Sequence, residues 1–438
     1  MNRVIRRLGG IVLGGALLVA TGIACSTPGE PAVSATESAA STSAAEDAAA
    51  VEAELREIAV RVSSLVDMGP AEAPPVTLID TDELRDLVDA LLGDPDAAAS
   101  LESDEQLFKI LGLIPADVDY ADLNREMLVD GVAGLYVPER QALYVRMFGR
   151  FSATEEAVAA HEFMHYVQDM NFDLERMQDE AGSDRDRQAA LSALIEGDAT
   201  IVQQDYMTEH LSPAQQFGML LGSLFVTPPP SAPLVMIRET TFAYLDGADF
   251  VAAVMSEGVS RATLYESPPV TAEQILHPER YLDGEERRPV TFTLPESALP
   301  DGWGRSSEVR LGELLLRTWL EEVGAGYGDA AAAADGWGGD SAYVLVESGE
   351  AVAVLARIEW DTRDEAMEFY SIVSAALDES RDFDPDVCAT CSYAAWRGPV
   401  GILGLASDDA VPGAPTTLAI APTVEGLDRL IVLAAATP

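Results

Sequence analysis

The pattern of hydrophobic and polar positions divides the chain into a long helical part and a shorter mixed part. Apolar residues recur at helical spacing in several stretches of the first part, at 51–66, 82–92, 102–113, 185–206, 242–255 and 272–276. After about residue 290 a hairpin, a helix and two strands are expected, at 341–360, 364–377, 400–406 and 418–421. The sequence therefore predicts an α+β protein, with a mostly helical domain over 51–290 and a smaller α+β portion over 291–438.

The first 25 residues carry the features of an export signal. Arginines at positions 3, 6 and 7 precede an apolar run from Leu8 to Ala20, and a cysteine, Cys25, follows the small residue Ala24. This arrangement resembles a bacterial lipoprotein signal, in which residues 1–24 are removed and Cys25 receives the lipid. The resemblance implies export and an anchor in the cell envelope, on the outer face of the cytoplasmic membrane. Plain secretion with an unlipidated cysteine, or an uncleaved transmembrane anchor, are the alternatives.

Residues 25–50 consist mainly of Ser, Thr, Ala, Glu and Pro, with almost no large apolar side chains. Such a segment cannot bury enough surface to offset its conformational entropy. We therefore expect a flexible tether between the lipid and the folded part of the chain.

Composition narrows the classes of function. Of 438 residues, 74 are acidic and 27 are Lys or Arg, which gives a formal net charge of −47, while 48% are hydrophobic. This apolar content is enough to bury at least one full core, so the acidity is expected on a folded surface. Nucleic acid is excluded as a partner, because no basic stripe is present to neutralise phosphates.

The segment 151–167 carries the main chemical signal. Ser152 followed by Glu155 is a capping box, which predicts the start of a helix. His161 and His165 lie four residues apart on one helical face, so both imidazoles can bind one metal. Glu162 is turned to the side, where its carboxylate can reach a metal-bound water. This is the His-Glu-x-x-His zinc signature, and two hydrogen-bonded core histidines are the alternative.

A catalytic zinc needs a third protein ligand and an open position for water. Glu196 lies in a second helical pattern, far enough after His165 for a turn and a returning helix. Its neighbours on the same face are small, namely Ser192, Ala193, Ala199 and Thr200. Small side chains allow two helices to approach closely, which a glutamate needs if it is to reach a metal on the first helix. Glu196 is therefore the predicted third ligand.

The set His161-Glu162-x-x-His165 followed by Glu196 resembles the gluzincin zinc metallopeptidases. Three stretches are also similar to uncharacterised exported bacterial proteins with these motifs, at 161–174, 193–200 and 273–281. The resemblance covers roughly residues 130–375 and implies a mostly helical zincin-like domain with a small β-sheet or hairpin edge. It implies Zn²⁺ held by the two histidines and Glu196, with Glu162 as general base.

One position departs from the thermolysin-like pattern. Those enzymes place an Asp one turn beyond the third ligand, where this chain has Thr200. Another group must therefore orient a zinc histidine, and Asp198 and Asp169 are the candidates.

Upstream of the metal helix, residues 134–146 predict a β-hairpin. In gluzincins the strand before the metal helix is a sheet edge that pairs with the substrate backbone. The resemblance therefore implies substrate binding by β-augmentation along one strand, made of Ala142, Leu143, Tyr144, Val145 and Arg146. An ordinary structural hairpin is the alternative.

Peptide hydrolysis also needs a hydrogen-bond donor for the oxyanion. His277, which precedes Pro278, and Tyr244 are the two residues proposed for this catalytic role. Arg280 and Tyr281 are weaker candidates, and local packing is the alternative for each.

Cys388 and Cys391 remain once Cys25 is assigned to the lipid. In an exported protein a disulfide between them is expected, with free thiols or a redox pair as alternatives.

Together these features predict an extracytoplasmic zinc-dependent peptidase, a hydrolase expected to act as a monomer on peptide or protein substrates. Two alternatives remain open. One is a non-enzymatic envelope lipoprotein, a binding or assembly module with a structural or vestigial zinc site. The other is a zinc amidase that acts on a non-peptide or cell-wall amide.

Overall fold

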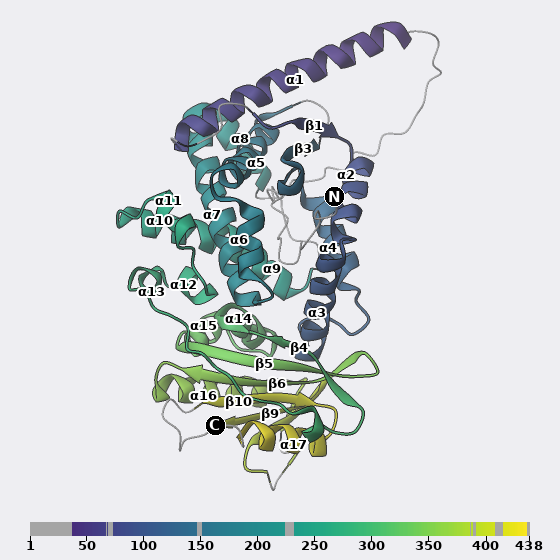
Figure 1. Ribbon diagram of the computed structural model, residues 1–438, viewed down its shortest axis with the longest axis vertical. Coiled ribbons are helices and arrows are strands. Elements are labelled where there is room, and N and C mark those ends of the chain that lie inside the picture. The colour runs from purple at the N-terminus through teal and green to yellow at the C-terminus, as the bar shows by residue number, and fades with distance from the viewer. Residues whose placement is uncertain are drawn as a thin grey trace.

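The computed structural model describes residues 37–66, 68, 73–146, 151–223, 232–385, 387–388, 391–407 and 415–435. The predicted signal peptide and Cys25 lie outside these residues. A helical part lies above a seven-stranded sheet, which occupies the lower end of the molecule in Figure 1. The α+β prediction is therefore confirmed.

The first helix, α1 (Glu37–Val66), begins inside the predicted tether. The expectation of a flexible segment over 25–50 is thus wrong from Glu37 onward. Residues 37–50 are rich in alanine and contain no glycine or proline, and alanine is the strongest helix former. The second half of α1 buries Leu55, Ile58 and Val62 in a core shared with α5 (Ala153–Phe172). A helix nucleated by this packing extends easily into the alanine-rich segment.

A small sheet stands beside the helices. Its strands β1 (Val76–Ile79), β3 (Ala142–Arg146) and β2 (Gly134–Val137) lie in that order. β3 pairs with β1 in parallel and with β2 in antiparallel orientation. The predicted hairpin is present, and the short helix η1 (Pro138–Arg140) forms its turn.

The helical part holds the elements that surround the histidine motif. Three helices link β1 to β2, namely α2 (Thr81–Leu92), α3 (Pro95–Leu111) and α4 (Tyr120–Gly131). The helices after α5 are α6 (Leu174–Ala181), α7 (Arg185–His210), α8 (Pro213–Ser223), α9 (Leu234–Thr241), the π-helical turn η2 (Phe242–Asp246), α10 (Gly247–Ser256), α11 (Arg261–Glu266), α12 (Ala272–Leu276) and α13 (Pro278–Leu282). α5 and α7 pack against each other through small residues, among them Ala159, Ala160 and Ala199.

The C-terminal sheet is antiparallel throughout and has the order β4-β5-β6-β10-β9-β8-β7. Its strands are β4 (Trp303–Val309), β5 (Trp337–Glu347), β6 (Glu350–Trp360), β7 (Asp384–Pro385), β8 (Ala394–Gly398), β9 (Gly401–Ser407) and β10 (Thr416–Ala421). The helices of this part are η3 (Glu296–Ala298), α14 (Gly312–Glu322), α15 (Tyr327–Ala334), α16 (Arg363–Glu379) and α17 (Val424–Ala435).

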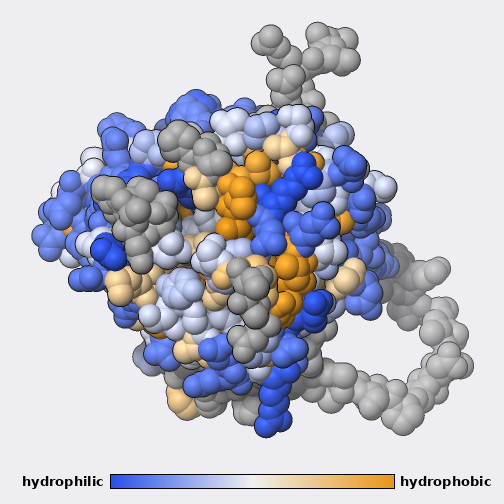
Figure 2. Space-filling view, turned by 90° about the horizontal axis from the view of Figure 1, so that it is seen from below, coloured by the Kyte–Doolittle hydropathy of each residue, from blue (hydrophilic) through white to orange (hydrophobic). Residues whose placement is uncertain are grey.

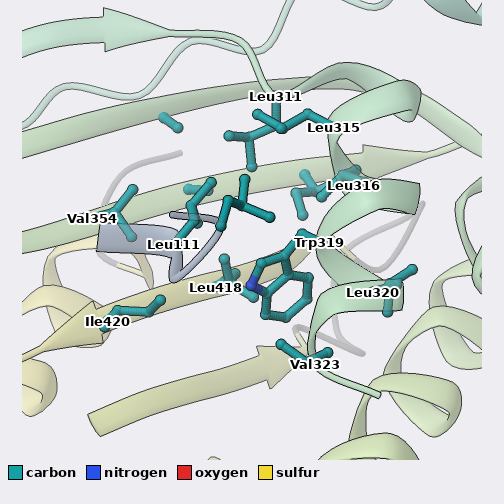
Figure 3. Close-up of a cluster of buried hydrophobic side chains, with 14 of the residues drawn as sticks. Leu111, Leu311, Leu315, Leu316, Trp319, Leu320, Val323, Val354, Leu418 and Ile420 are labelled. Carbon is teal, nitrogen blue, oxygen red and sulfur yellow. The ribbon is translucent and has the colours of Figure 1, made fainter. Parts of the chain in front are cut away.

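One core joins the two parts of the chain. α14, α15 and α16 contribute to it together with the sheet, and so does α3 from the helical part. In Figure 3, Trp319 of α14 lies among residues of three other elements, including Leu111 of α3, Val354 of β6 and Leu418 of β10. A second, smaller core contains α17, the segment 292–299 and residues of β5, β6, β8, β9 and β10 that do not belong to the first core.

The lower face of the molecule is predominantly hydrophilic. Figure 2 views the molecule from below, and hydrophilic residues cover most of this face around a central hydrophobic area. Most described carboxylates are exposed or half-buried; those that are buried are Asp94, Glu155, Glu162, Asp186, Glu196, Asp198, Glu273, Glu313 and Asp340.

Among the described helices, none is long and apolar enough to span a bilayer.

Candidate metal centre

Helix α5 carries the two histidines. Its first turn is closed by the predicted capping box, in which the Ser152 amide donates to the Glu155 carboxylate at 3.0 Å and the Thr154 amide donates to the Ser152 hydroxyl at 3.2 Å. The imidazoles of His161 and His165 lie side by side, with ring centroids 4.7 Å apart, and both are buried.

Helix α7 brings Glu196 to the same point. Its Oε2 lies 3.1 Å from Nε2 of His161 and 3.5 Å from Nε2 of His165. The structure thus brings together the three predicted zinc ligands. Of the small residues around Glu196, Ala199 packs toward α5, whereas Ala193 packs in a different core with α10.

The donor set fits a cation. Nδ1 of His165 lies 2.8 Å from Oε1 of Gln168, whose Nε2 donates to the Ile195 carbonyl at 2.9 Å. Nδ1 therefore carries the proton, and the lone pair of Nε2 faces the Glu196 carboxylate without a hydrogen-bond partner. Two acceptors facing each other in a buried site need a positive charge between them. Their spacing also suits zinc, since tetrahedral Zn–N and Zn–O bonds of about 2.1 Å separate ligand atoms by about 3.4 Å.

The protonation equilibria describe the same centre without a metal. Burial alone would raise the pKa of Glu196, but the two histidines lower it to about 2. Burial alone would lower the pKa of His165, but the Glu196 carboxylate raises it to about 9. Burial and the neighbouring His165 lower the pKa of His161. Without a metal, a proton on His165 supplies the positive charge beside the Glu196 carboxylate, and a bound cation would take its place.

Gln168 orients His165, and sequence reasoning missed it. It lies three residues beyond His165 on α5 and is fully buried. Its helical spacing could have identified it. Asp198 is one of the two residues proposed for this role. It contacts Gln168 instead of His165, at 3.4 Å from the Gln168 amide, and it accepts from Arg261 at 2.7 Å. The other, Asp169, accepts instead from the Tyr136 hydroxyl at 2.7 Å.

Glu162 lies against the small sheet. Its Oε2 accepts from the backbone amide of Tyr136 at 2.8 Å. Gly134 also packs closely against Glu162. A Cβ at position 134 would lie only 3.0 Å from Cγ of Glu162 and Cγ1 of Val158. Gly134 and Tyr136 both belong to β2, so this strand and α5 together fix the position of the Glu162 carboxylate.

The prediction for the substrate-binding strand is wrong in its choice of strand. Ala142, Leu143, Tyr144, Val145 and Arg146 form β3, which is paired on both sides and has no free backbone edge. The edge strand is β2. The Arg146 amide donates to Ala133, so the alternation of an antiparallel ladder turns the backbone groups of Gly134 and Tyr136 away from β3.

Tyr244 lies at the centre, as predicted. Its ring stacks on the His161 imidazole with centroids 5.8 Å apart. Burial raises the pKa of its phenol well above the usual value, and the charges of Glu196 and Glu162 raise it further. Tyr244 is in the π-helical turn η2, a rare conformation often found at functional sites. Close contact between Gly197 of α7 and Gly247 of α10 holds this turn against α7.

His277 is not brought to the histidine pair, and the prediction that it donates to the oxyanion is wrong. Its Nε2 lies 3.1 Å from Glu313, 3.0 Å from Asp335 and 3.2 Å from Arg317. Burial alone would lower the pKa of His277, but the hydrogen bond and charge of Glu313 raise it. These carboxylates of the C-terminal part draw the imidazole into a separate polar cluster. Arg280 binds Glu273 and Asp361 in the same region.

Cys388 and Cys391 form a disulfide.

Comparison with known proteins adds one finding. A family model described as a domain of unknown function (DUF8575) matches residues 298–431. No curated protein and no solved structure matches the chain. The matched region contains the C-terminal sheet, whereas His161, Glu162, His165, Glu196 and Tyr244 all precede it.

Proposed function

We propose that this protein is a zinc-dependent hydrolase that cleaves peptide bonds. The observation that carries the proposal is the convergence of His161, His165 and Glu196, with atom spacings of 3.1 and 3.5 Å, beside the anchored carboxylate of Glu162. Three nitrogen and oxygen donors with a neighbouring glutamate are the usual equipment of a catalytic zinc site.

The two histidines and Glu196 would hold the metal. A zinc ion bound there would polarise the scissile carbonyl and lower the pKa of a bound water. Glu162 would act as the general base, accepting a proton from the attacking water and passing it to the leaving amine. The Tyr136 amide holds the Glu162 carboxylate in place for both transfers. The phenol of Tyr244, kept protonated by its raised pKa, donates to the developing oxyanion.

Substrate would bind along β2 instead of β3. The outward groups that this edge offers to an extended peptide are those of Gly134 and the Tyr136 carbonyl, because the Tyr136 amide is already bound to Glu162. All four residues of β2 are buried, so strand addition requires this edge to be uncovered. With 27 basic residues against 74 acidic ones, backbone pairing and apolar contacts contribute more to binding than charge does. We expect the reaction to occur in the cell envelope, because the first 25 residues resemble a lipoprotein signal.

A structural zinc site is the second candidate function. His161, Glu162, His165 and Glu196 are each at most 4% exposed, which is also expected of a metal that only holds helices together. Tyr244 stacks on His161 and interacts with Glu196, so its phenolate could fill the fourth position. X-ray absorption at the zinc edge distinguishes the two functions: a water ligand supports the hydrolase, and a tyrosinate ligand supports the structural site.

The decisive experiment combines metal analysis with peptide cleavage. Tag-free protein should contain one zinc, and Glu196→Ala should lose it. A peptide library and a panel of cell-wall amides are then offered to the wild type and to Glu162→Gln. Cleavage of peptides that Glu162→Gln abolishes while zinc is retained supports the proposal. Cleavage of the cell-wall amides alone would favour the amidase, and zinc-free protein would remove the metal assignment.

A further inference from the structure

A cavity of about 490 Å³ opens between α6, the first half of α7 and the segment after α11. Pockets for small ligands commonly have volumes of about 300–1,000 Å³. One wall is aromatic, because the rings of Phe172 and Tyr265 stack with centroids 4.2 Å apart and planes within 6°. Met177, Leu191 and Pro269 also line the cavity and are themselves buried, so each contributes a small apolar area. The cavity therefore offers contacts for a large apolar group.

Arg187 supplies a positive charge beside this apolar surface. It lines the cavity, is half-buried, and forms no ion pair with any residue in the described ranges. Most described arginines, by contrast, pair with a carboxylate, and acidic residues outnumber basic ones by 74 to 27. Arg176, also at the cavity, is exposed and pairs with Glu180 at 2.6 Å. Arg187 is thus the cation available to an incoming anion.

The rim limits which anion fits. Asp173, Glu180 and Glu266 line the cavity and are exposed, and of these Glu180 pairs with Arg176. They would repel a second carboxylate on the ligand and attract an amine. The charges therefore favour a ligand with one carboxylate.

The cavity does not open onto the metal centre through its aromatic wall. Tyr265 donates to Asp198 at 3.0 Å, and Asp198 in turn contacts Gln168, the residue that orients His165. Gln168, Asp198 and Tyr265 are all buried, and their contacts link the cavity lining to His165. Phe172 also lies two helical turns beyond His165, about 10 Å along α5. A ligand held here is not positioned for hydrolysis.

We propose that this cavity binds a monocarboxylate with a large apolar side chain. Its carboxylate pairs with Arg187, and its side chain packs on Phe172 and Tyr265. This is the chemistry of a free apolar amino acid or of the C-terminal residue of a peptide. The inference does not depend on the proposed hydrolase activity.

Isothermal titration of the purified chain tests the proposal with three probes: L-phenylalanine, N-acetyl-L-phenylalanine and N-acetyl-L-phenylalaninamide. The acetylated acid represents a peptide C-terminus, and its amide lacks only the charge. We expect at least one acid to bind, and the amide to bind about tenfold more weakly or worse, as for a lost charged hydrogen bond. Stronger binding of the free amino acid would identify it as the ligand source, and stronger binding of the acetylated acid would identify a peptide end.

Arg187→Gln should reduce acid binding about tenfold, to the level of the amide. Arg397→Gln, at an exposed arginine of β8 outside the cavity, is the control and should retain wild-type binding. Repeating the titration with a metal chelator separates this cavity from carboxylate binding at a metal. Equal binding of acid and amide, unchanged binding in Arg187→Gln, loss of binding with chelator, or no binding of any probe at millimolar concentration would each overturn the proposal. The acid–amide comparison needs no variant, so it holds even where Arg187→Gln folds poorly.

Discussion

Nδ1 of His165 lies 2.8 Å from Oε1 of Gln168, one helical turn further along α5. This contact fixes the imidazole so that Nε2 points at Glu196. Groups that orient a metal-binding histidine typically contribute about 10–100-fold to metal affinity. We therefore expect Gln168→Leu to weaken zinc binding by about that factor. Competitive titration against a chelator of known affinity measures it.

Gln203→Leu is the matched control for this prediction. Gln203 is a half-buried glutamine on α7 that donates to the Ala157 carbonyl at 3.0 Å. Its loss should leave zinc affinity unchanged. Equal affinities of Gln168→Leu and the wild type would show that the glutamine has no orienting role.

Gly134 leaves space for the Glu162 carboxylate. A Cβ there would lie 3.0 Å from Cγ of Glu162, closer than relaxed van der Waals contact. Gly134→Val should displace the carboxylate and reduce kcat by about tenfold or more, since proton transfer depends on position. Zinc content should stay at the wild-type level, because the three ligands are untouched.

The control for Gly134 is Gly304→Val in β4, where an added Cβ would meet no atom within 4 Å. Its kcat should match that of the wild type. A Gly134→Val enzyme with full kcat would argue against Glu162 as the general base held by β2.

The sequence predicted the elements that local signals specify. The capping box at Ser152 and the alternation over 341–360 led to the correct helix and hairpin. Local signals do not specify the order of the strands in a sheet. β3 is central because β1 pairs with it, and β1 comes from a segment well before the hairpin. Nothing local to 134–146 specifies that partner, so the edge was assigned to the wrong strand.

In the candidate site, too, local sequence patterns predicted some residues but not the contacts between distant segments. His161, His165 and Glu196 follow from helical spacing and small neighbours, and the structure brings them together. The contact from the Tyr136 amide to Glu162 depends on how a strand packs across a helix, which spacing does not encode. The assignment of His277 failed for a related reason. Its partners Glu313 and Asp335 come from the C-terminal part, far along the chain.

Gly197 and Gly247 allow α7 and α10 to touch backbone to backbone. A Cβ on Gly197 would overlap the backbone of Gly247 and Ala248, which cannot rotate away. Gly197→Ala should therefore lower the free energy of unfolding by about 1–3 kcal/mol, as overpacking does, despite the higher helix propensity of alanine. Urea denaturation measures the change.

Gly218→Ala on α8 provides the comparison, because a Cβ there would meet no atom within 4 Å. Alanine should stabilise that helix by up to about 1 kcal/mol. A stabilising Gly197→Ala would contradict the close packing that holds Tyr244 beside His161.

Asp186 makes stability depend on pH. Burial raises the pKa of its carboxyl to about 7, and the nearby Asp184 and Asp340 add to the effect, while the Ala272 amide and Arg287 oppose it. Unfolding returns the pKa to about 3.9. Between these values the folded state holds the proton and the unfolded state does not, so the free energy of unfolding falls as pH rises. Asp186→Asn removes this dependence and keeps an acceptor for the Ala272 amide, which donates at 3.0 Å.

The stability of Asp186→Asn relative to the wild type should therefore increase from about pH 4 to about pH 7, by a few kcal/mol at most. Urea denaturation of both proteins across this range measures it. Gln204→Ala, at an exposed and non-titratable position on the same helix, is the control and should show no such trend. A constant difference between Asp186→Asn and the wild type would mean that Asp186 is charged throughout, and that Arg287, 3.9 Å away, offsets its burial.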